Sequence, residues 1–228
     1  AYEAGVPHLA AILESGRLQH ALWQAIGADG NVALHCPATI ASLERGESFT
    51  RITLADGSLL EAELVVGADG AASRIREWAG LGSTLTPYGQ SGVVANFECE
   101  KPHHNTAFQW FRADGVLAWL PLPGNRISMV WSTPETHAQE LLGLDAPKLC
   151  GRVAKAGNDR LGALSLQAPP AAFPLRLTRV PRIVALRLAL IGDAAHAIHP
   201  LSGHGINLGF LDARALAGVL QALPEFGD

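Results

Sequence analysis

Two short apolar runs that lie far apart in the chain end in the same way, and this pair limits the fold more than any other feature. Residues 64–66 lead into Gly67-Ala68-Asp69-Gly70, and residues 188–191 lead into Gly192-Asp193. Apolar runs of this length are typical of strands buried on both faces, as in parallel sheets covered by helices. The sequence therefore predicts an α/β fold built around two buried strands, each of which delivers an acid at its end.

The first third of the chain mixes helical and extended patterns. Apolar residues recur with helical spacing between 18 and 26, with Ser15 as the expected N-cap and Gly27 as the stop. Asp56-Gly57 has the composition of a hairpin turn, and a short helix is predicted at 73–79. Four β-prone runs are predicted as strands, at 32–35, 39–43, 49–54 and 59–66.

The middle third has the alternation of an antiparallel sheet. Apolar residues at 93–97 alternate with polar ones, and turn signals at 113–115 and 123–125 separate three further extended runs. Two helices are predicted after this meander. The first has Pro134 at its first position, where proline is well tolerated, and the second covers 146–156.

These changes of character predict two domains. Residues 1–83 and 183–228 form a doubly wound α/β domain, and an antiparallel β-sheet domain at 84–182 is inserted between them. The last helix is predicted at 206–220. Its expected buried stripe consists of Leu208, Leu211, Ala215 and Val219.

Asp69, Gly70, Ser73 and Arg76 form the first motif with chemical content. An acid at the end of a strand can accept hydrogen bonds from sugar hydroxyls, and glycine lets a backbone approach a ligand closely. Ser73 and Arg76 share a helix face because they are three residues apart, and arginine suits phosphate recognition. The alternative is an ordinary strand–turn–helix connection in which Asp69 caps the helix.

The second motif begins at Gly192 and ends at Asn207. Asp193 follows its strand directly and is placed to hold a polyol chain, while Gly203 and Gly205 lead into the start of a helix. Free N–H groups and the helix dipole at such a start favour a ligand that carries negative charge. Reduced flavin is a ligand of this kind.

Three histidines in the second motif, His196, His199 and His204, raise the alternative of a metal site. No cysteine or carboxylate cluster accompanies them, and Pro200 separates them, so no metal is predicted. The three cysteines of the chain include no C-x-x-C pair. This spacing argues against a zinc site or a disulfide framework and fits a reducing compartment.

Charge and hydropathy exclude further classes of protein. The formal net charge is −4 and no cluster of Lys and Arg stands out, so the electrostatic footprint of a nucleic-acid-binding protein is missing. Each of the longest uncharged runs is interrupted by glycine and proline, so no transmembrane span is predicted.

Taken together, the two motifs resemble those of the flavoprotein aromatic hydroxylases of the para-hydroxybenzoate hydroxylase fold. That family carries D-G-x-x-S-x-x-R, which Asp69 to Arg76 match, and G-D-A-A-H-x-x-x-P-x-x-G-x-G-x-N, which Gly192 to Asn207 match without a gap. Within the superfamily the chain is most similar to the ubiquinone-biosynthesis hydroxylases, through local phrases such as those at 117–122 and 130–132.

The resemblance implies an FAD-dependent monooxygenase. NAD(P)H would reduce FAD, O2 would form a flavin C4a-hydroperoxide, and one oxygen atom would pass to the ring of a polyprenylated phenol or quinol. His199 would lie near the flavin, and Trp119 and Trp131 would line the substrate pocket. The implied cofactor-binding residues are Asp69, Gly70, Ser73, Arg76, Gly192, Asp193, Pro200, Gly203, Gly205, Ile206 and Asn207.

Family members open with a strand followed by G-x-G-x-x-G, which cradles the FAD pyrophosphate, and this chain has no such pattern. We therefore expect the chain to be a fragment that lacks this unit. Two alternatives remain open: a non-catalytic scaffold or lipid-binding subunit among quinone-biosynthesis proteins, and another flavin enzyme of the same fold, a reductase or halogenase. The expected location is cytoplasmic, with the lipid substrate drawing the protein to the inner membrane.

Overall fold

The computed structural model describes residues 5, 10–199 and 203–223. The chain divides into two compact units. We call Ala1–Leu34 with Gly89–Pro174 the meander unit, and His35–Tyr88 with Leu175–Asp228 the motif unit. The predicted inserted domain, 84–182, begins five residues before and ends eight residues after the segment Gly89–Pro174 of the meander unit. Ala1–Leu34, predicted as part of the α/β domain, falls in the meander unit. The role of the inserted domain as a substrate domain stays a prediction.

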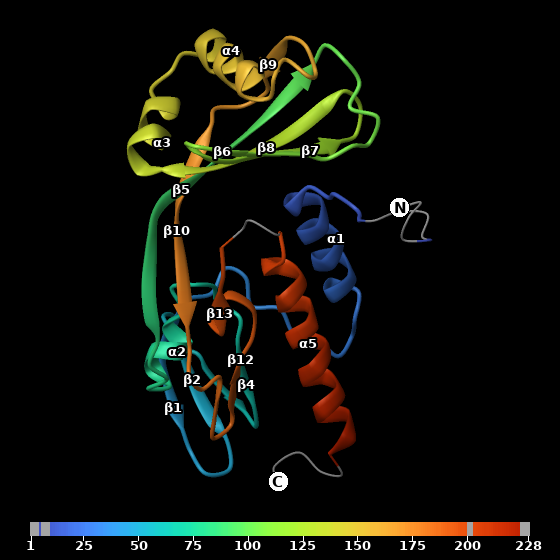
Figure 1. Ribbon diagram of the computed structural model, residues 1–228. Coiled ribbons are helices and arrows are strands. Elements are labelled where there is room, and N and C mark those ends of the chain that lie inside the picture. Colours follow the sequence, from blue (N-terminus) through green and yellow to red (C-terminus); the bar gives the residue numbers. More distant parts are fainter. Residues whose placement is uncertain (1–4, 6–9, 200–202, 224–228) are drawn as a thin grey trace. The chain divides into compact units, whose positions relative to one another are not determined.

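The meander unit is built on an antiparallel sheet. Its strands follow the order β13-β10-β5-β8-β7-β6, in which the short edge strand β13 (His196–Ala197) pairs with the motif-unit end of β10, and β9 also pairs with β5 (Figure 1). The hairpin between β6 and β7 and the turn between β7 and β8 lie where the sequence predicted them. The bounds are β5 Thr84–Cys99, β6 Phe108–Arg112, β7 Gly115–Leu122, β8 Arg126–Pro134, β9 Leu164–Leu166 and β10 Ala171–Arg179.

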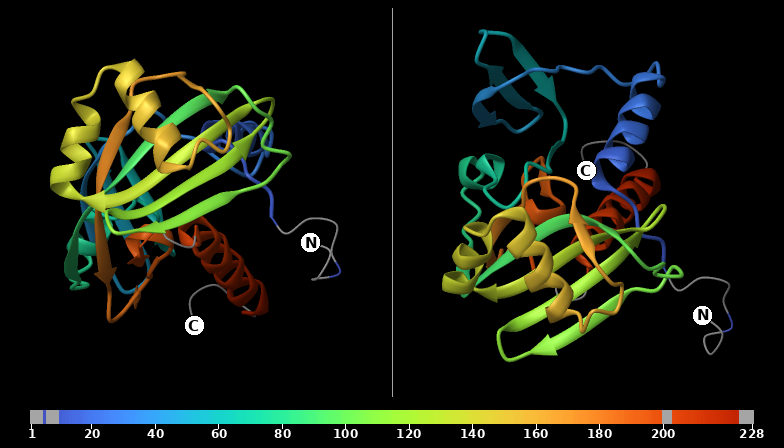
Figure 2. Two further views of the ribbon diagram at one scale, coloured as in Figure 1. Left: turned by 45° about the horizontal axis from the view of Figure 1, so that its top comes forward. Right: turned by 90° about the horizontal axis from the view of Figure 1, so that it is seen from above.

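One face of this sheet forms the core of the meander unit. The helices α3 (Glu135–Leu142) and α4 (Ala146–Ala156) cover it, as Figure 2 shows. Each large side chain buried there contributes roughly 1.5–3 kcal/mol to stability. The fully buried members include Val93, Phe97, Leu117, Trp119, Ile127, Met129 and Trp131 from the strands, and Leu141, Leu149 and Val153 from the helices.

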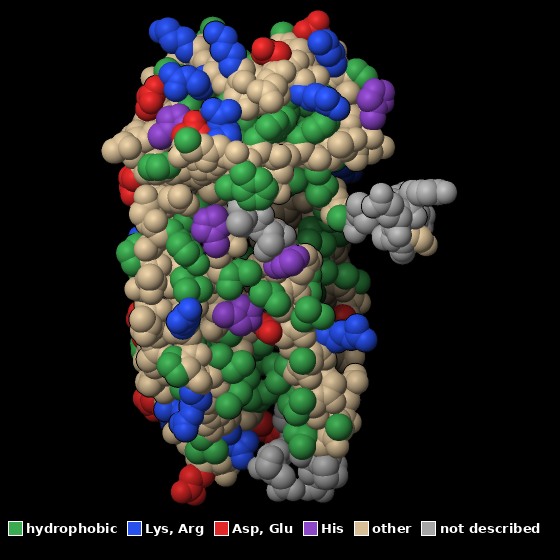
Figure 3. Space-filling model, in the orientation of Figure 1, with side chains coloured by type: hydrophobic (Ala, Val, Ile, Leu, Met, Phe, Trp, Pro, Cys, Tyr) green, Lys and Arg blue, Asp and Glu red, His purple; other side chains and the backbone are tan. Residues whose placement is uncertain are grey.

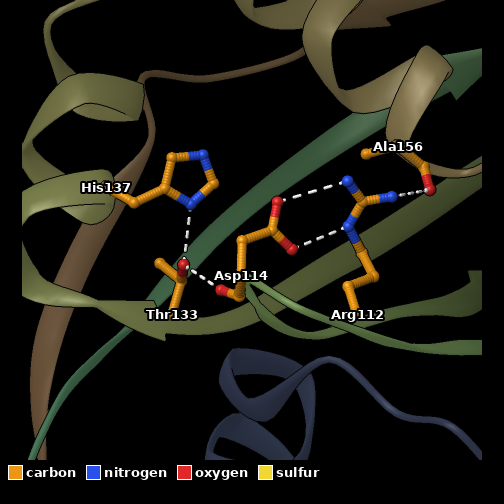
Figure 4. A network of polar contacts seen from close by, with 5 residues as sticks. All are labelled: Arg112, Asp114, Thr133, His137 and Ala156. Atoms are coloured by element: carbon orange, nitrogen blue, oxygen red, sulfur yellow. Dashed lines mark hydrogen bonds and ion pairs between the residues drawn. The ribbon is translucent and has the colours of Figure 1, made fainter.

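A polar network fastens the β6–β7 hairpin to the helices of the meander unit (Figure 4). Arg112 donates two hydrogen bonds to the carboxylate of Asp114, at 2.8 and 3.2 Å, and one to the carbonyl of Ala156 at the end of α4, at 2.9 Å. The Thr133 hydroxyl donates to the carbonyl of Asp114, so it must accept from Nδ1 of His137. The hydrogen bonds from Arg112 hold the pKa of the Asp114 carboxyl below its usual value.

The motif unit contains the two apolar runs as neighbouring parallel strands. β4 (Val65–Gly67) pairs with β12 (Leu188–Leu190), and β11 (Val184–Ala185) pairs with the other edge of β12. The helix α2 (Arg74–Trp78) packs against this sheet through Ile75, which is 4% exposed. The α/β class predicted from the two runs is therefore confirmed.

A second sheet of the motif unit comes from the β-prone runs at its start. β1 (Ile40–Arg45), β2 (Thr50–Leu54) and β3 (Leu59–Ala62) form an antiparallel meander, with the predicted turn at Gly57. The predicted strand at 32–35 is wrong, since those residues are exposed and irregular. The single run predicted at 59–66 is two strands, β3 and β4, which pair in different sheets.

The helices match their predicted positions more closely than their predicted caps and faces. α1 covers Ser15–Gly27, so Ser15 is its first residue and not its cap, and Pro134 precedes α3 instead of opening it. The long helix α5 covers Gly205–Ala222. The buried stripe predicted for α5 is largely wrong, because Leu211 and Val219 are 57% and 60% exposed.

Two further properties concern the described part of the chain as a whole. No helix there is both long and apolar enough to cross a bilayer. The three cysteines are free thiols in different settings: Cys36 is exposed, Cys150 is half-buried and Cys99 is buried. Burial raises the pKa of the Cys99 thiol to about 11.

Candidate functional site

The two acid-bearing motifs of the sequence leave the motif-unit sheet at one edge. β4 and β12 are parallel, with Gly67 opposite Leu190 at their ends, and the Ile191 N–H donates to the Gly67 carbonyl at 3.0 Å. The segments that carry Asp69 and Asp193 therefore start beside each other. The carboxyl ends of parallel strands are where α/β proteins bind their ligands.

Asp69 acts as a cap within the fold. One carboxylate oxygen accepts from the Ser73 hydroxyl and the other accepts from the Ile75 N–H at 3.1 Å. The Ser73 side chain, fully buried, is the N-cap of α2 and accepts from the Arg76 N–H at 3.0 Å. The structure thus shows the capping arrangement that the sequence left as an alternative. Gly70 has a φ of +84°, which the tight turn requires.

Arg76 joins the two motifs. Its guanidinium is buried, 6% exposed, and donates to the carbonyl of Ala194 at 2.9 Å and to the carbonyl of Ala71 at 2.9 Å. Among the described residues it has no carboxylate partner. Both hydrogen bonds point into the protein, so the phosphate-binding role expected for Arg76 finds no support in its position.

The turn that carries Asp193 is held from several sides, while Asp193 itself is exposed. Gly192–Ala194 form a 3-10 turn in which Gly192 has a φ of +58°. Asp212 from α5 accepts from the Gly192 N–H at 2.9 Å and from Nε2 of His196 at 2.7 Å. No described residue hydrogen-bonds the Asp193 carboxylate. It is therefore free to bind a ligand.

The start of α5 carries the other predicted site residues. Gly205 is the first helical residue, and a Cβ placed on it or on Gly203 would meet no atom within 4 Å. The first N–H groups of a helix have no partner within it. Ile206 is 56% exposed, and the Asn207 amide donates to the Gly203 carbonyl at 3.4 Å. Pro200, also predicted for this site, lies outside the described residues.

The histidines of the second motif do not gather around a metal in the described part of the chain, where no cluster of three ligands is present. Figure 3 shows histidine side chains on the surface of the face that carries α5. His196 binds Asp212, as above. The His199 ring stands edge-on to the ring of Tyr88, with centroids 4.9 Å apart. Burial lowers the pKa of His199, which favours its neutral form at neutral pH.

Trp119 and Trp131, expected in the substrate pocket, lie in the core of the meander unit. Both are fully buried on the face covered by α3 and α4, and Trp110 packs edge-on against Trp119 at 4.8 Å. A Cβ on Gly157 would lie within 2.8 Å of three Trp119 ring atoms. Their positions support packing and not ligand contact.

The opposite face of the same sheet is largely apolar and lies outside the core. Strand registers align Gln109, Ala118, Val130 and Val94 in one row across β6, β7, β8 and β5. Side chains in such a row lie on the same face. We call this the open face; besides that row it carries the largely apolar set Phe111, Val116, Leu120 and Ser128. Most of its members are half-buried, and Phe111 is 76% exposed.

Sequence reasoning missed three residues that shape the site. Gly67 fills the junction of β4, β12 and α2, where a Cβ would lie 2.7 Å from Cδ2 of Leu190. A Cβ on Gly209 would lie 3.4 Å from the Cα of Gly192, so α5 touches the Asp193 turn closely. Asp212 is the only acid in α5, and a carboxylate in a largely apolar helix was the available signal.

The fold defines an α/β protein in which two parallel strands end side by side and a glycine-flanked helix, α5, packs against the turn after the second strand. A family model described as "FAD binding domain" matches residues 39–224. The chain belongs to this FAD binding domain family.

Comparison with known proteins gives a consistent set of relatives. The chain is 38% identical over 228 residues to 3-demethoxyubiquinol 3-hydroxylase of Escherichia coli, and covers 58% of it. It is 37% identical to the ubiquinone hydroxylase UbiL of Rhodospirillum rubrum over 95% of this chain and 50% of that protein. Among solved structures, pqsL of Pseudomonas aeruginosa, a probable FAD-dependent monooxygenase, superposes with a TM-score of 0.77 at 25% identity, over 90% of this chain and 58% of pqsL.

The chain thus spans between half and three fifths of the length of these curated relatives. The family and the fold are shared over nearly all of the present sequence.

Proposed function

We propose that the whole protein is an FAD-dependent monooxygenase that hydroxylates the ring of a polyprenylated phenol or quinol in ubiquinone biosynthesis. Family membership and the names of the relatives support this class of reaction. The single observation that carries the proposal is the exposed Asp193 carboxylate, on a turn that α5 contacts through Gly209 and Asp212.

The residues at this site fit a flavin. The Asp193 carboxylate accepts hydrogen bonds and suits the hydroxyls of a ribityl chain, and Gly203 and Gly205 leave room for a flat ring system to approach backbone N–H groups. When bound, FAD supplies the redox chemistry, taking electrons from NAD(P)H and passing them to O2. Asp69 and Arg76 support this site without contacting the ligand. Asp69 accepts from the Ile75 N–H at the start of α2, and Arg76 donates to the Ala194 carbonyl beside Asp193.

The overall reaction balances with one pyridine nucleotide. NAD(P)H, a proton, O2 and an aromatic C–H would give NAD(P)⁺, water and an aromatic C–OH. Two electrons come from NAD(P)H and two from the ring, and together they reduce O2 to water and the hydroxyl oxygen. No residue of the chain needs to act as a nucleophile.

The open face of the meander unit is the wall proposed for the substrate. It is a broad and mostly apolar surface that does not belong to the core, and an apolar ring with a prenyl tail matches it. A substrate of this kind resides in a membrane. We propose that it draws the protein to the membrane surface, where other quinone-biosynthesis proteins would be met.

Asp193→Ala in the whole protein tests the cofactor part of the proposal. Losing hydrogen bonds to a charged group costs roughly 1.5–3 kcal/mol, so FAD affinity should fall about 10- to 150-fold. The measurement is a titration of the apoprotein with FAD, followed by flavin fluorescence. Glu63→Ala is the matched control, since Glu63 is an exposed acid of the motif unit whose side chain has no described partner.

The enzymatic part is tested by incubating the protein with FAD, NAD(P)H, O2 and a polyprenylated phenol, with mass spectrometry of the product. A gain of one oxygen atom in the substrate is expected. Tight FAD binding without any oxygenated product would favour another flavin enzyme. No FAD binding by the wild type would favour the scaffold alternative.

A further inference from the structure

Within the described part of the chain, Asp212 is the residue of α5 whose side chain hydrogen-bonds the turn that carries Asp193. A single carboxylate oxygen, Oδ2, accepts both from the Gly192 N–H at 2.9 Å and from Nε2 of His196 at 2.7 Å. The side chains of Asp212 and His196 are 26% and 30% exposed. This oxygen therefore contacts the residue just before Asp193 and the residue three positions after it.

Backbone contact one helical turn earlier fixes the distance between the two elements. A Cβ on Gly209 would lie 3.4 Å from the Cα of Gly192. The backbones of α5 and the turn are therefore so close that a side chain larger than alanine at position 209 would push them apart. Gly192 has a φ of +58° and its carbonyl accepts from the Ala195 N–H at 2.9 Å. The turn is thus tight, and Asp212 bridges its two ends.

Arg76 also holds this turn. Its guanidinium donates to the carbonyl of Ala194, the residue that follows Asp193, and this hydrogen bond links the turn to α2. Ala194 is completely buried, whereas Asp193 is exposed. Within Gly192–Ala195, Asp193 is the exposed residue.

We propose that Asp212 is a positioning residue for the cofactor: it holds the Gly192–His196 turn so that the Asp193 carboxylate is presented in a fixed place. This inference rests on the proposed function, because it assumes that Asp193 binds FAD. Asp212 itself touches no ligand in this account. Its effect on FAD affinity passes entirely through Asp193.

A double-mutant cycle in the whole protein tests the proposal. Asp212→Ala should weaken FAD binding about tenfold, since both hydrogen bonds to the turn are lost. In an Asp193→Ala background the same change should alter FAD affinity less than about twofold, because residues that act through one another are not additive. Equal losses in both backgrounds would overturn the proposal and leave Asp212 a general structural residue.

Asp212→Asn is the conservative variant. Its amide oxygen can accept both hydrogen bonds that Oδ2 accepts now, so it should restore most of the FAD affinity lost in Asp212→Ala. If Asn behaves like Ala, hydrogen bonding to the turn is not the cause and the proposal fails. If Asp212→Ala does not fold, His196→Ala removes one of the two bonds and should give a smaller loss that also vanishes with Asp193→Ala.

Amide hydrogen exchange on the apoprotein provides a readout that needs no cofactor. Asp212→Ala should speed exchange at Gly192 while exchange in the β4 and β12 strands stays as in the wild type. Unchanged exchange at Gly192 would contradict the proposal that Asp212 holds the turn. If the wild type binds no FAD but Asp212→Ala still speeds exchange at Gly192, the proposed function is wrong. Asp212 would then remain the residue that orders the turn.

Discussion

At the scale of single residues, the start of α5 combines open space with backbone N–H groups that have no partner among the described residues. Gly205 has no neighbour within 4 Å of a would-be Cβ, and its N–H group belongs to the unpartnered first turn of the helix. A residue that fits without strain and still disturbs binding must act on the ligand. Gly205 is therefore a position where folding and ligand binding can be separated.

Gly205→Val should fold normally and bind FAD at least about tenfold more weakly, because the side chain would occupy the space that the flavin needs. Thermal unfolding of the apoprotein and FAD titration together check this. Gly16→Val is the matched control, since Gly16 lies at the start of α1 with equally open surroundings. Equal FAD affinity in both variants would show that the flavin does not approach Gly205.

Asp114 should make the meander unit sensitive to acid. Its pKa is lowered in the folded protein by the hydrogen bonds from Arg112, so the ionised form stabilises the fold at neutral pH. This contribution is complete above the ordinary pKa, about 4, and is lost as pH falls through the lower folded value.

The expected result is that Asp114→Asn is less stable than the wild type at pH 6 and that the two converge at low pH. Urea unfolding between about pH 2 and pH 7 checks this. Asp159→Asn serves as the control, because Asp159 is exposed and has no described side-chain partner. A constant gap between wild type and Asp114→Asn at all pH values would contradict the role of the ionised carboxyl.

At the scale of elements, the three-way junction at Gly67 decides how closely α2 and the strands pack. A Cβ there would lie 2.7 Å from Cδ2 of Leu190 and 2.8 Å from Cγ2 of Ile75, and both neighbours are buried. Gly67→Ala should therefore destabilise the protein by about 1–3 kcal/mol through overpacking. Chemical unfolding measures the change. Gly82→Ala, in open surroundings of the same unit, should leave stability nearly unchanged or slightly raised.

The same scale shows what sequence patterns can and cannot supply. The positions of α4, of the β6–β7 hairpin and of the two apolar runs followed from periodicity and turn residues, which are local signals. The face of α5 that packs against the protein could not be predicted in this way, because apolar residues occur on nearly all sides of the helix. The half-buried face includes Leu208, Asp212 and Leu216, and Asp212 hydrogen-bonds another segment of the chain. The sequence of the helix alone does not show which segment it will contact.

The candidate site divides in a similar way. Asp193, Gly203 and Gly205 were predicted from their order after a strand, and the structure leaves all three accessible. Asp69 and Arg76 were also predicted from their place in a motif after a strand, and their polar atoms hydrogen-bond within the protein. The residue type determines which partners a side chain can bind. The fold determines whether those hydrogen-bonding groups are already engaged by neighbouring residues.

At the scale of the whole molecule, the proposal assigns the cofactor to the motif unit and the substrate to the open face of the meander unit. Val130→Thr changes that face with almost no change of volume. Burying a hydroxyl against an apolar substrate without a partner costs about 1–3 kcal/mol, so KM should rise about fivefold or more. FAD affinity should stay within about twofold of the wild type.

Steady-state kinetics with varied substrate, together with FAD titration, checks this separation. Val32→Thr, at an exposed position outside the strands, is the control. Asp193→Ala should show the opposite pattern, with weakened FAD binding. A Val130→Thr protein with unchanged KM would place the substrate elsewhere.

The alternation along β7 has a consequence for how such a protein can change over time. Leu117 and Trp119 point into the core, while their neighbours Val116, Ala118 and Leu120 belong to the open face. Neighbouring codons in this strand are therefore under different selection: those of the core residues for folding, and those of the open-face residues for the ligand that contacts the sheet. During evolution the open-face residues can change and bind new ligands while the core residues preserve the strand.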